Sequence, residues 1–129
     1  MASAPSKLQI AIVSANAETI AELSAYLAGV GVDSRACSDP SDLATRARRA
    51  AAIVVFPDEL SPAPLRAALL AARRRRPDLT LVFVTSRPRE IELLAGRTSG
   101  AVVLPKPAFG WTIVDALRAA QPKRRRSGG

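Results

Sequence analysis

The side chains that could do chemistry in this 129-residue chain include no imidazole. The sequence has no histidine and a single cysteine, Cys37. A lone cysteine cannot form an internal disulfide, and without histidine the common zinc ligand sets are missing. Arg35 is the one cation near Cys37 along the chain, so we expect a buried, unreactive strand residue rather than a reactive thiol. We therefore predict a protein of the reducing cytoplasm with no metal and no cofactor.

A phosphate group could bind at segment 14–19, where the sequence SANAET separates a predicted strand from a predicted helix. This segment loosely resembles the hydroxyl-rich loop by which flavodoxin-type proteins hold a flavin phosphate at a helix N-terminus. However, it has no glycine, and Glu18 would repel an anion at the first turn. We expect Asn16 to cap the helix instead.

Four short apolar segments and one weaker strand candidate, 32–37, alternate with five helical patterns along the chain. The predicted strands cover 8–13, 32–37, 51–56, 79–84 and 101–104, and the predicted helices cover 17–29, 39–49, 61–74, 88–95 and 109–120. The third helix has Leu65, Leu69 and Leu70 as its predicted apolar face. Strands that are apolar throughout are buried on both faces, and right-handed crossovers through helices make such strands parallel. The sequence thus predicts an α/β fold, a three-layer, doubly wound, five-stranded parallel sheet.

The length fits one domain, which we place at residues 7–121. Residues 1–6 are expected to be a disordered N-terminus, and residues 122–129 a basic tail or the start of a linker. The apolar segment 8–13 is too short for the core of a signal peptide, and no stretch approaches the length of a membrane span.

Two segments resemble the receiver domain of response regulators, the CheY-like family. Segment 81–86 (LVFVTS) is similar to the family's fourth strand, which ends in a hydroxyl residue followed by a small one. Segment 99–109 (SGAVVLPKPAF) is similar to its fifth strand and the lysine-proline sequence that follows. The resemblance extends over residues 8–120 and implies the flavodoxin-like topology of that family. It also implies a cis peptide bond before Pro107.

The resemblance implies a degenerate phosphorylation pocket. Active receivers end the first strand in two acidic residues that hold magnesium and the third in the aspartate that accepts a phosphoryl group, whereas the matching residues here are Ser14, Ala15 and Phe56. These three side chains can assemble neither the metal site nor the nucleophile. Thr85 and Lys106 match the family's phosphoryl contacts, and without a phosphate we expect a strand-end hydrogen bonder and a solvated or carbonyl-bonded amine.

Two carboxylates lie close to this pocket along the chain. A shifted register could bring Asp58 or Glu59 into it, but Pro57 ends the strand before either, so we expect neither to enter. Instead, we predict that Phe56 is buried and fills the pocket with apolar surface.

Charge is strongly asymmetric along a chain with a formal net charge of +8. The basic residues of three runs at helix ends should gather at one end of the domain, near Lys7: Arg46, Arg48, Arg49, Arg73, Arg74, Arg75, Arg76, Lys123, Arg124, Arg125 and Arg126. Acidic residues should gather at the other end: Glu18, Asp39, Asp42, Asp58, Glu59, Glu90 and Glu92. Helix dipoles alone favour this arrangement. A basic end could equally dock an acidic protein surface, a nucleic-acid backbone or anionic lipid.

We interpret the chain as a pseudo-receiver, meaning a receiver-like domain that works without phosphorylation and is not an enzyme. It would bind a protein partner in bacterial signalling or regulation, with a homodimer possible and no membrane insertion. The candidate interface, supplied by the resemblance, includes Val103, at the family's aromatic switch position, together with Trp111, Asp115 and Arg118. Trp111 either packs in the core or remains exposed for a partner. The alternative function is a basic, nucleic-acid-associated domain that binds through its arginine-rich end.

Overall fold

The computed structural model describes residues 9–46, 48, 50–95 and 101–120. The strands are β1 (Gln9–Val13), β2 (Asp33–Cys37), β3 (Ala52–Val55), β4 (Thr80–Thr85) and β5 (Ala101–Pro105). The α-helices are α1 (Ala17–Gly29), α2 (Leu43–Arg46), α3 (Pro62–Arg75), α4 (Pro88–Ala95) and α5 (Gly110–Ala120). Two 3₁₀ turns, η1 (Pro40–Asp42) and η2 (Pro57–Glu59), precede α2 and α3.

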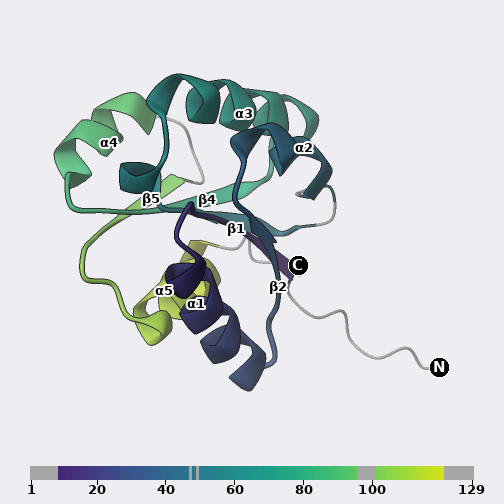
Figure 1. Cartoon of the computed structure of the whole chain (residues 1–129), viewed down its shortest axis with the longest axis vertical. Coiled ribbons are helices and arrows are strands. Elements are labelled where there is room, and N and C mark those ends of the chain that lie inside the picture. Colours follow the sequence, from purple (N-terminus) through teal and green to yellow (C-terminus); the bar gives the residue numbers. More distant parts are fainter. Residues whose placement is uncertain (1–8, 47, 49, 96–100, 121–129) are drawn as a thin grey trace, which may run out of the picture.

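All strand pairs are parallel, and the sheet order is β2-β1-β3-β4-β5. Helices α1 and α5 cover one face of the sheet, and α2, α3 and α4 cover the other (Figure 1). The predicted three-layer, doubly wound architecture is confirmed. No helix in the described ranges is both long and apolar enough to cross a membrane.

The core consists of two apolar layers separated by the sheet. Alternate side chains of each strand enter opposite layers: on β1, Ile10 and Ile12 pack toward α1 and α5, whereas Ala11 and Val13 pack toward α2 and α3. Every residue of β3 and β4 is buried. Both faces of the central strands are therefore removed from water, which explains their unbroken apolar sequence.

Asn16 caps α1, as its sequence position predicted. Its Oδ1 accepts hydrogen bonds from the backbone N–H groups of Glu18 (2.8 Å) and Thr19 (3.2 Å). These are the N–H groups that a phosphate at this helix end would need, so the cap favours the structural interpretation of segment 14–19.

Two details of the predicted helices are wrong. The helix predicted over 39–49 is divided within its described residues, because the Asp39 side chain accepts from the Ser41 N–H and begins a 3₁₀ turn that passes into the short α2. Leu70 is 56% exposed, and Ala72 takes the buried position on α3. Starting from Leu65, a helical stripe passes through positions three, four and seven residues later, and Leu70 lies off that stripe.

Phe56 directly follows β3 and is 6% exposed. Its ring packs into the layer beneath α1 and α5, with Ile12, Val54 and Val84 in the same cluster. An aspartate here would lose this packing and place a charge in an apolar layer.

The substitution Phe56→Asp should therefore lower the free energy of unfolding by about 2 to 4 kcal/mol. Urea denaturation followed by circular dichroism measures the loss. Phe56→Leu is the control, because it keeps an apolar side chain and should lose less. A Phe56→Asp variant as stable as the parent would show that the site after β3 is open and polar.

Candidate functional site

The carboxyl ends of four neighbouring strands bring polar side chains to one edge of the sheet. Thr85 is the last residue of β4 and is fully buried, and Lys106 follows β5. The Lys106 N–H donates to the Thr85 carbonyl at 3.0 Å, which joins the two strand ends. Ser14 follows β1 and is also fully buried. This edge corresponds to the pocket that the sequence resemblance implied.

The carboxylate of Asp58 lies in this pocket. Its Oδ1 accepts a hydrogen bond from Thr85 Oγ1 (2.6 Å), and its Oδ2 accepts from the Ser86 N–H (2.8 Å) and from Ser86 Oγ (2.9 Å). Lys106 Nζ lies 3.5 Å from the same Oδ2. The Asp58 side chain is only 15% exposed, so the pocket contains an ionic group that the chain itself supplies.

The expectation that no carboxylate enters the pocket is wrong. Pro57 does end β3, but it also begins η2, a tight turn that directs Asp58 back to the sheet edge. Two further expectations are also wrong. Lys106 pairs with Asp58 instead of being a solvated or carbonyl-bonded amine, and the ring of Phe56 lies in the apolar core beneath α1 and α5, leaving the pocket polar.

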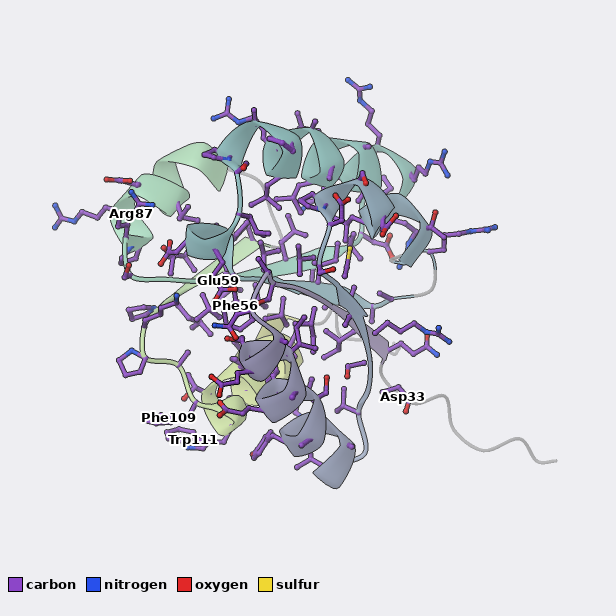
Figure 2. All side chains as sticks on the ribbon, viewed as in Figure 1. Asp33, Phe56, Glu59, Arg87, Phe109 and Trp111 are labelled. Atoms are coloured by element: carbon purple, nitrogen blue, oxygen red, sulfur yellow. The ribbon has the colours of Figure 1, made fainter. Side chains whose placement is uncertain are left out.

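Glu59 makes the second connection from η2 to the strand ends. Ser14 Oγ donates a short hydrogen bond to Glu59 Oε1 and accepts one from the Asn16 N–H at 3.0 Å. Ala15 is exposed and contributes no functional group. Figure 2 shows Glu59 close to the middle of the sheet edge, near Phe56. Both carboxylates of η2 are therefore engaged by the protein's own hydroxyl groups.

Opposing effects act on the pKa of Asp58. Burial raises it, but the backbone N–H of Ser86, the hydroxyl groups of Thr85 and Ser86, and the charge of Lys106 together outweigh burial. The pKa of Asp58 is lowered from 3.8 to about 2. The carboxylate is therefore ionised at neutral pH and forms an ion pair with Lys106.

A magnesium ion, implied by the resemblance to active receivers, does not fit these side chains. Magnesium is held by one or two carboxylates with near-octahedral geometry. Here both oxygens of Asp58 already accept hydrogen bonds, and the ammonium group of Lys106 lies where it would repel a cation. In the described part of the chain, no three His, Cys, Asp or Glu side chains gather closely enough to hold a metal ion.

The start of α5 exposes two aromatic side chains. Phe109 and Trp111 are 57% and 58% exposed, and their rings stack with centroids 6.0 Å apart and planes 8° apart. The helix predicted over 109–120 begins one residue later, at Gly110, so Phe109 precedes α5 and its ring stacks on that of Trp111. Gly110 has no side chain, and the ring of Tyr26 from α1 lies against its backbone.

The other residues of the candidate interface divide into surface and core. Asp115 and Arg118 are exposed on α5. Val103 is half-buried and packs against the core layer on the side of α3 and α4, so it belongs to the core. The buried side chains of α5 include Ile113, Val114 and Leu117, which leaves Trp111 outside the core.

Part of the predicted basic end is assembled where α2 and α3 finish. Arg76 Nη1 donates to the Arg48 carbonyl at 3.0 Å, which places the two arginine-rich ends side by side. Arg49 and the basic run 123–126 lie outside the described residues. Cys37 is buried, and its Sγ donates to the Asp39 carbonyl at 3.0 Å, as expected for a structural cysteine.

Sequence reasoning missed the part played by Ser86 and placed Asp58 outside the pocket. The available signal was the proline that directly precedes Asp58, because proline begins a tight turn as readily as it ends a strand. The cis peptide bond between Lys106 and Pro107, implied by the resemblance, is present.

The substitution Asp58→Asn tests the ionic contribution of this carboxylate. A pKa lowered from 3.8 to about 2 stabilises the folded protein above pH 4, and this stabilisation disappears as the pH falls toward 2. The free energy of unfolding of the parent minus that of the variant should therefore be roughly 2 kcal/mol larger at pH 6 than at pH 2. Urea denaturation at both pH values measures this, with Asp33→Asn at an exposed position as the control. The same difference in free energy of unfolding at both pH values would contradict the lowered pKa of Asp58.

Comparison with known proteins identifies the fold. No family model and no curated protein matches the sequence. Among solved structures, the chain is similar to the chemotaxis protein CheY4 of Vibrio cholerae, with a TM-score of 0.77, 14% identity and coverage of 89% of this chain and 99% of that one. A sensor protein from Polaromonas sp. JS666 gives a TM-score of 0.73, 24% identity and coverage of 89% and 96%.

A receiver domain of an HD domain-containing protein from Pseudomonas fluorescens Pf-5 gives a TM-score of 0.74 and 17% identity, with coverage of 89% of this chain and 94% of that one. The strand order, the flanking helices and these similarities agree. The chain has the CheY-like fold of response-regulator receiver domains.

Proposed function

We propose that this protein is a phosphorylation-independent pseudo-receiver that binds a protein partner in a bacterial signalling or regulatory pathway in the cytoplasm. It acts by binding and not by catalysis. The observation that carries this proposal is the state of the pocket: buried Phe56 follows β3, and the protein's own donors already engage both nearby carboxylates.

Phosphoryl transfer requires an accessible oxygen nucleophile and a cation that stabilises the transferred group. Phe56 has no nucleophilic atom. Asp58 has one, but its two oxygens accept three hydrogen bonds and pair with Lys106, so attack on a phosphoryl donor would first require these contacts to break. These contacts support a structural role for Asp58.

The stacked pair of Phe109 and Trp111 supports a role in binding. Figure 2 shows both side chains projecting away from the sheet at the start of α5. Each of these two large aromatic rings is more than half exposed, so its apolar surface remains in contact with water unless a partner covers it. Tryptophan is enriched among the residues that dominate binding energy at protein interfaces.

Intact-mass analysis after incubation with acetyl phosphate and magnesium tests the absence of phosphorylation. The mass of the parent should not change, because no carboxylate in the pocket is available to a phosphoryl donor. Asp58→Asn is the matched control. A stable gain of one phosphoryl group in the parent that disappears in Asp58→Asn would overturn the proposal.

Trp111 is the one tryptophan in the sequence and therefore reports on its own environment. In dilute protein its fluorescence should be accessible to a soluble quencher, and it should become protected as the protein concentration or the amount of partner rises. Trp111→Ala should lower the free energy of unfolding by no more than about 1.5 kcal/mol, because the side chain lies outside the core and loses only its stack with Phe109, while association should weaken.

Leu70→Ala is the control for this measurement, because Leu70 is equally exposed but lies on α3, on the other face of the sheet. If Trp111→Ala unfolds the domain, or if association is unchanged in this variant, the start of α5 is not the binding site.

A further inference from the structure

The hydrogen-bond donors around Asp58 are of the kinds that bind an oxyanion. Two hydroxyl groups, one backbone N–H and one ammonium group converge on a single carboxylate from Thr85, Ser86 and Lys106. These donors come from the junctions that follow β4 and β5, whereas the carboxylate comes from the turn that follows β3. Backbone N–H groups, hydroxyls and a lysine are the same donors that hold phosphate and sulfate in proteins.

The site is preorganised by contacts that do not involve Asp58. The Arg87 N–H donates to Thr85 Oγ1 at 2.9 Å, which leaves the Thr85 hydroxyl hydrogen for the anion. The bond from the Lys106 N–H to the Thr85 carbonyl holds the junction after β5 against the end of β4. Removing the Asp58 carboxylate would therefore leave a set of donors and a positive charge without their acceptor.

We propose that Asp58 is a built-in ligand for the donors of Thr85, Ser86 and Lys106, which we call the oxyanion cradle, and that it holds the loops after β3, β4 and β5 in one permanently liganded arrangement. Two members of the cradle, Thr85 and Lys106, match the phosphoryl contacts that the resemblance implied. Glu59 extends the connection to β1 through Ser14. A ligand tethered within the chain has a high effective concentration, so a free anion competes with it poorly. This device deepens the proposed function and rests on it, because it explains how the loops are held without a phosphoryl group.

The cradle is open to solvent at Ser86 and Lys106, which are both exposed. Asp58 and Arg87 help to line a groove of about 320 Å³ between α3 and α4, whose other lining residues include Leu65, Leu69 and Ile91. A small anion could therefore reach the cradle once the Asp58 carboxylate is removed.

Thermal unfolding of Asp58→Ala in increasing sulfate, at constant ionic strength with chloride, tests the proposal. Sulfate should raise the Tm of this variant saturably, by roughly 3 to 6 °C at tenfold excess over its Kd. The parent should show no saturable rise, because its cradle is already filled. Adding Lys106→Met to Asp58→Ala should weaken sulfate binding about tenfold, as expected for the loss of one charge-assisted contact.

Asp33→Ala is the charge-matched control, because it also removes one aspartate from a basic protein but lies far from the cradle on β2 (Figure 2). If sulfate stabilises Asp58→Ala no more than Asp33→Ala, or stabilises the parent equally, the cradle does not exist.

Should Asp58→Ala fail to fold, hydrogen exchange of the Ser86 amide in the parent decides: protection unaffected by sulfate supports the built-in ligand, and rapid exchange overturns it. Sulfate cannot transfer a phosphoryl group, so a phosphorylated parent would overturn the proposed function alone.

Discussion

The ionic contact between Asp58 and the ends of β4 and β5 is the interaction through which the functional edge of this protein is held together. Parallel strands deliver their loops to the same edge, where each loop carries polar groups that must find partners. Here the buried Thr85 hydroxyl, the Ser86 N–H and the Lys106 ammonium share one acceptor. The Asp58 carboxylate satisfies the fully buried Thr85 hydroxyl, and leaving a buried group unsatisfied costs more than a single hydrogen bond contributes.

This contact depends on the way in which the chain leaves β3. Phe56 enters the apolar layer beneath α1 and α5, and the tight turn η2 then brings Asp58 and Glu59 back to the strand ends. The buried ring anchors one side of the turn while the two carboxylates anchor the other. Apolar burial and ionic pairing thus act on consecutive residues, and together they define a single conformation for the loop.

The two faces of the molecule differ in their chemistry. The side of α1 and α5 exposes Phe109, Trp111 and Tyr26. On the other side, the last turn of α3 carries the arginines that follow Ala72, and Arg76 donates to the Arg48 carbonyl near the end of α2. Arginines at a helix C-terminus interact favourably with the helix dipole, so the basic end has a structural explanation. Phe109 and Trp111 are each more than half exposed, and this exposed aromatic surface is what supports a binding role.

The sequence by itself determined the strands, the order of the elements, the cap at Asn16 and the burial of Phe56, because each follows from local pattern: apolar runs in every strand but β2, turn residues and helix-cap residues. Tertiary structure alone decided what fills the pocket, which side chain of α3 is exposed and how Phe109 meets Trp111. Asp58 contacts Thr85 and Lys106, 27 and 48 residues further along the chain, and no local pattern encodes which distant donors a carboxylate will meet. That pairing is decided when the sheet brings the strand ends together, because only then do a turn of three residues and two strand ends lie within hydrogen-bonding distance.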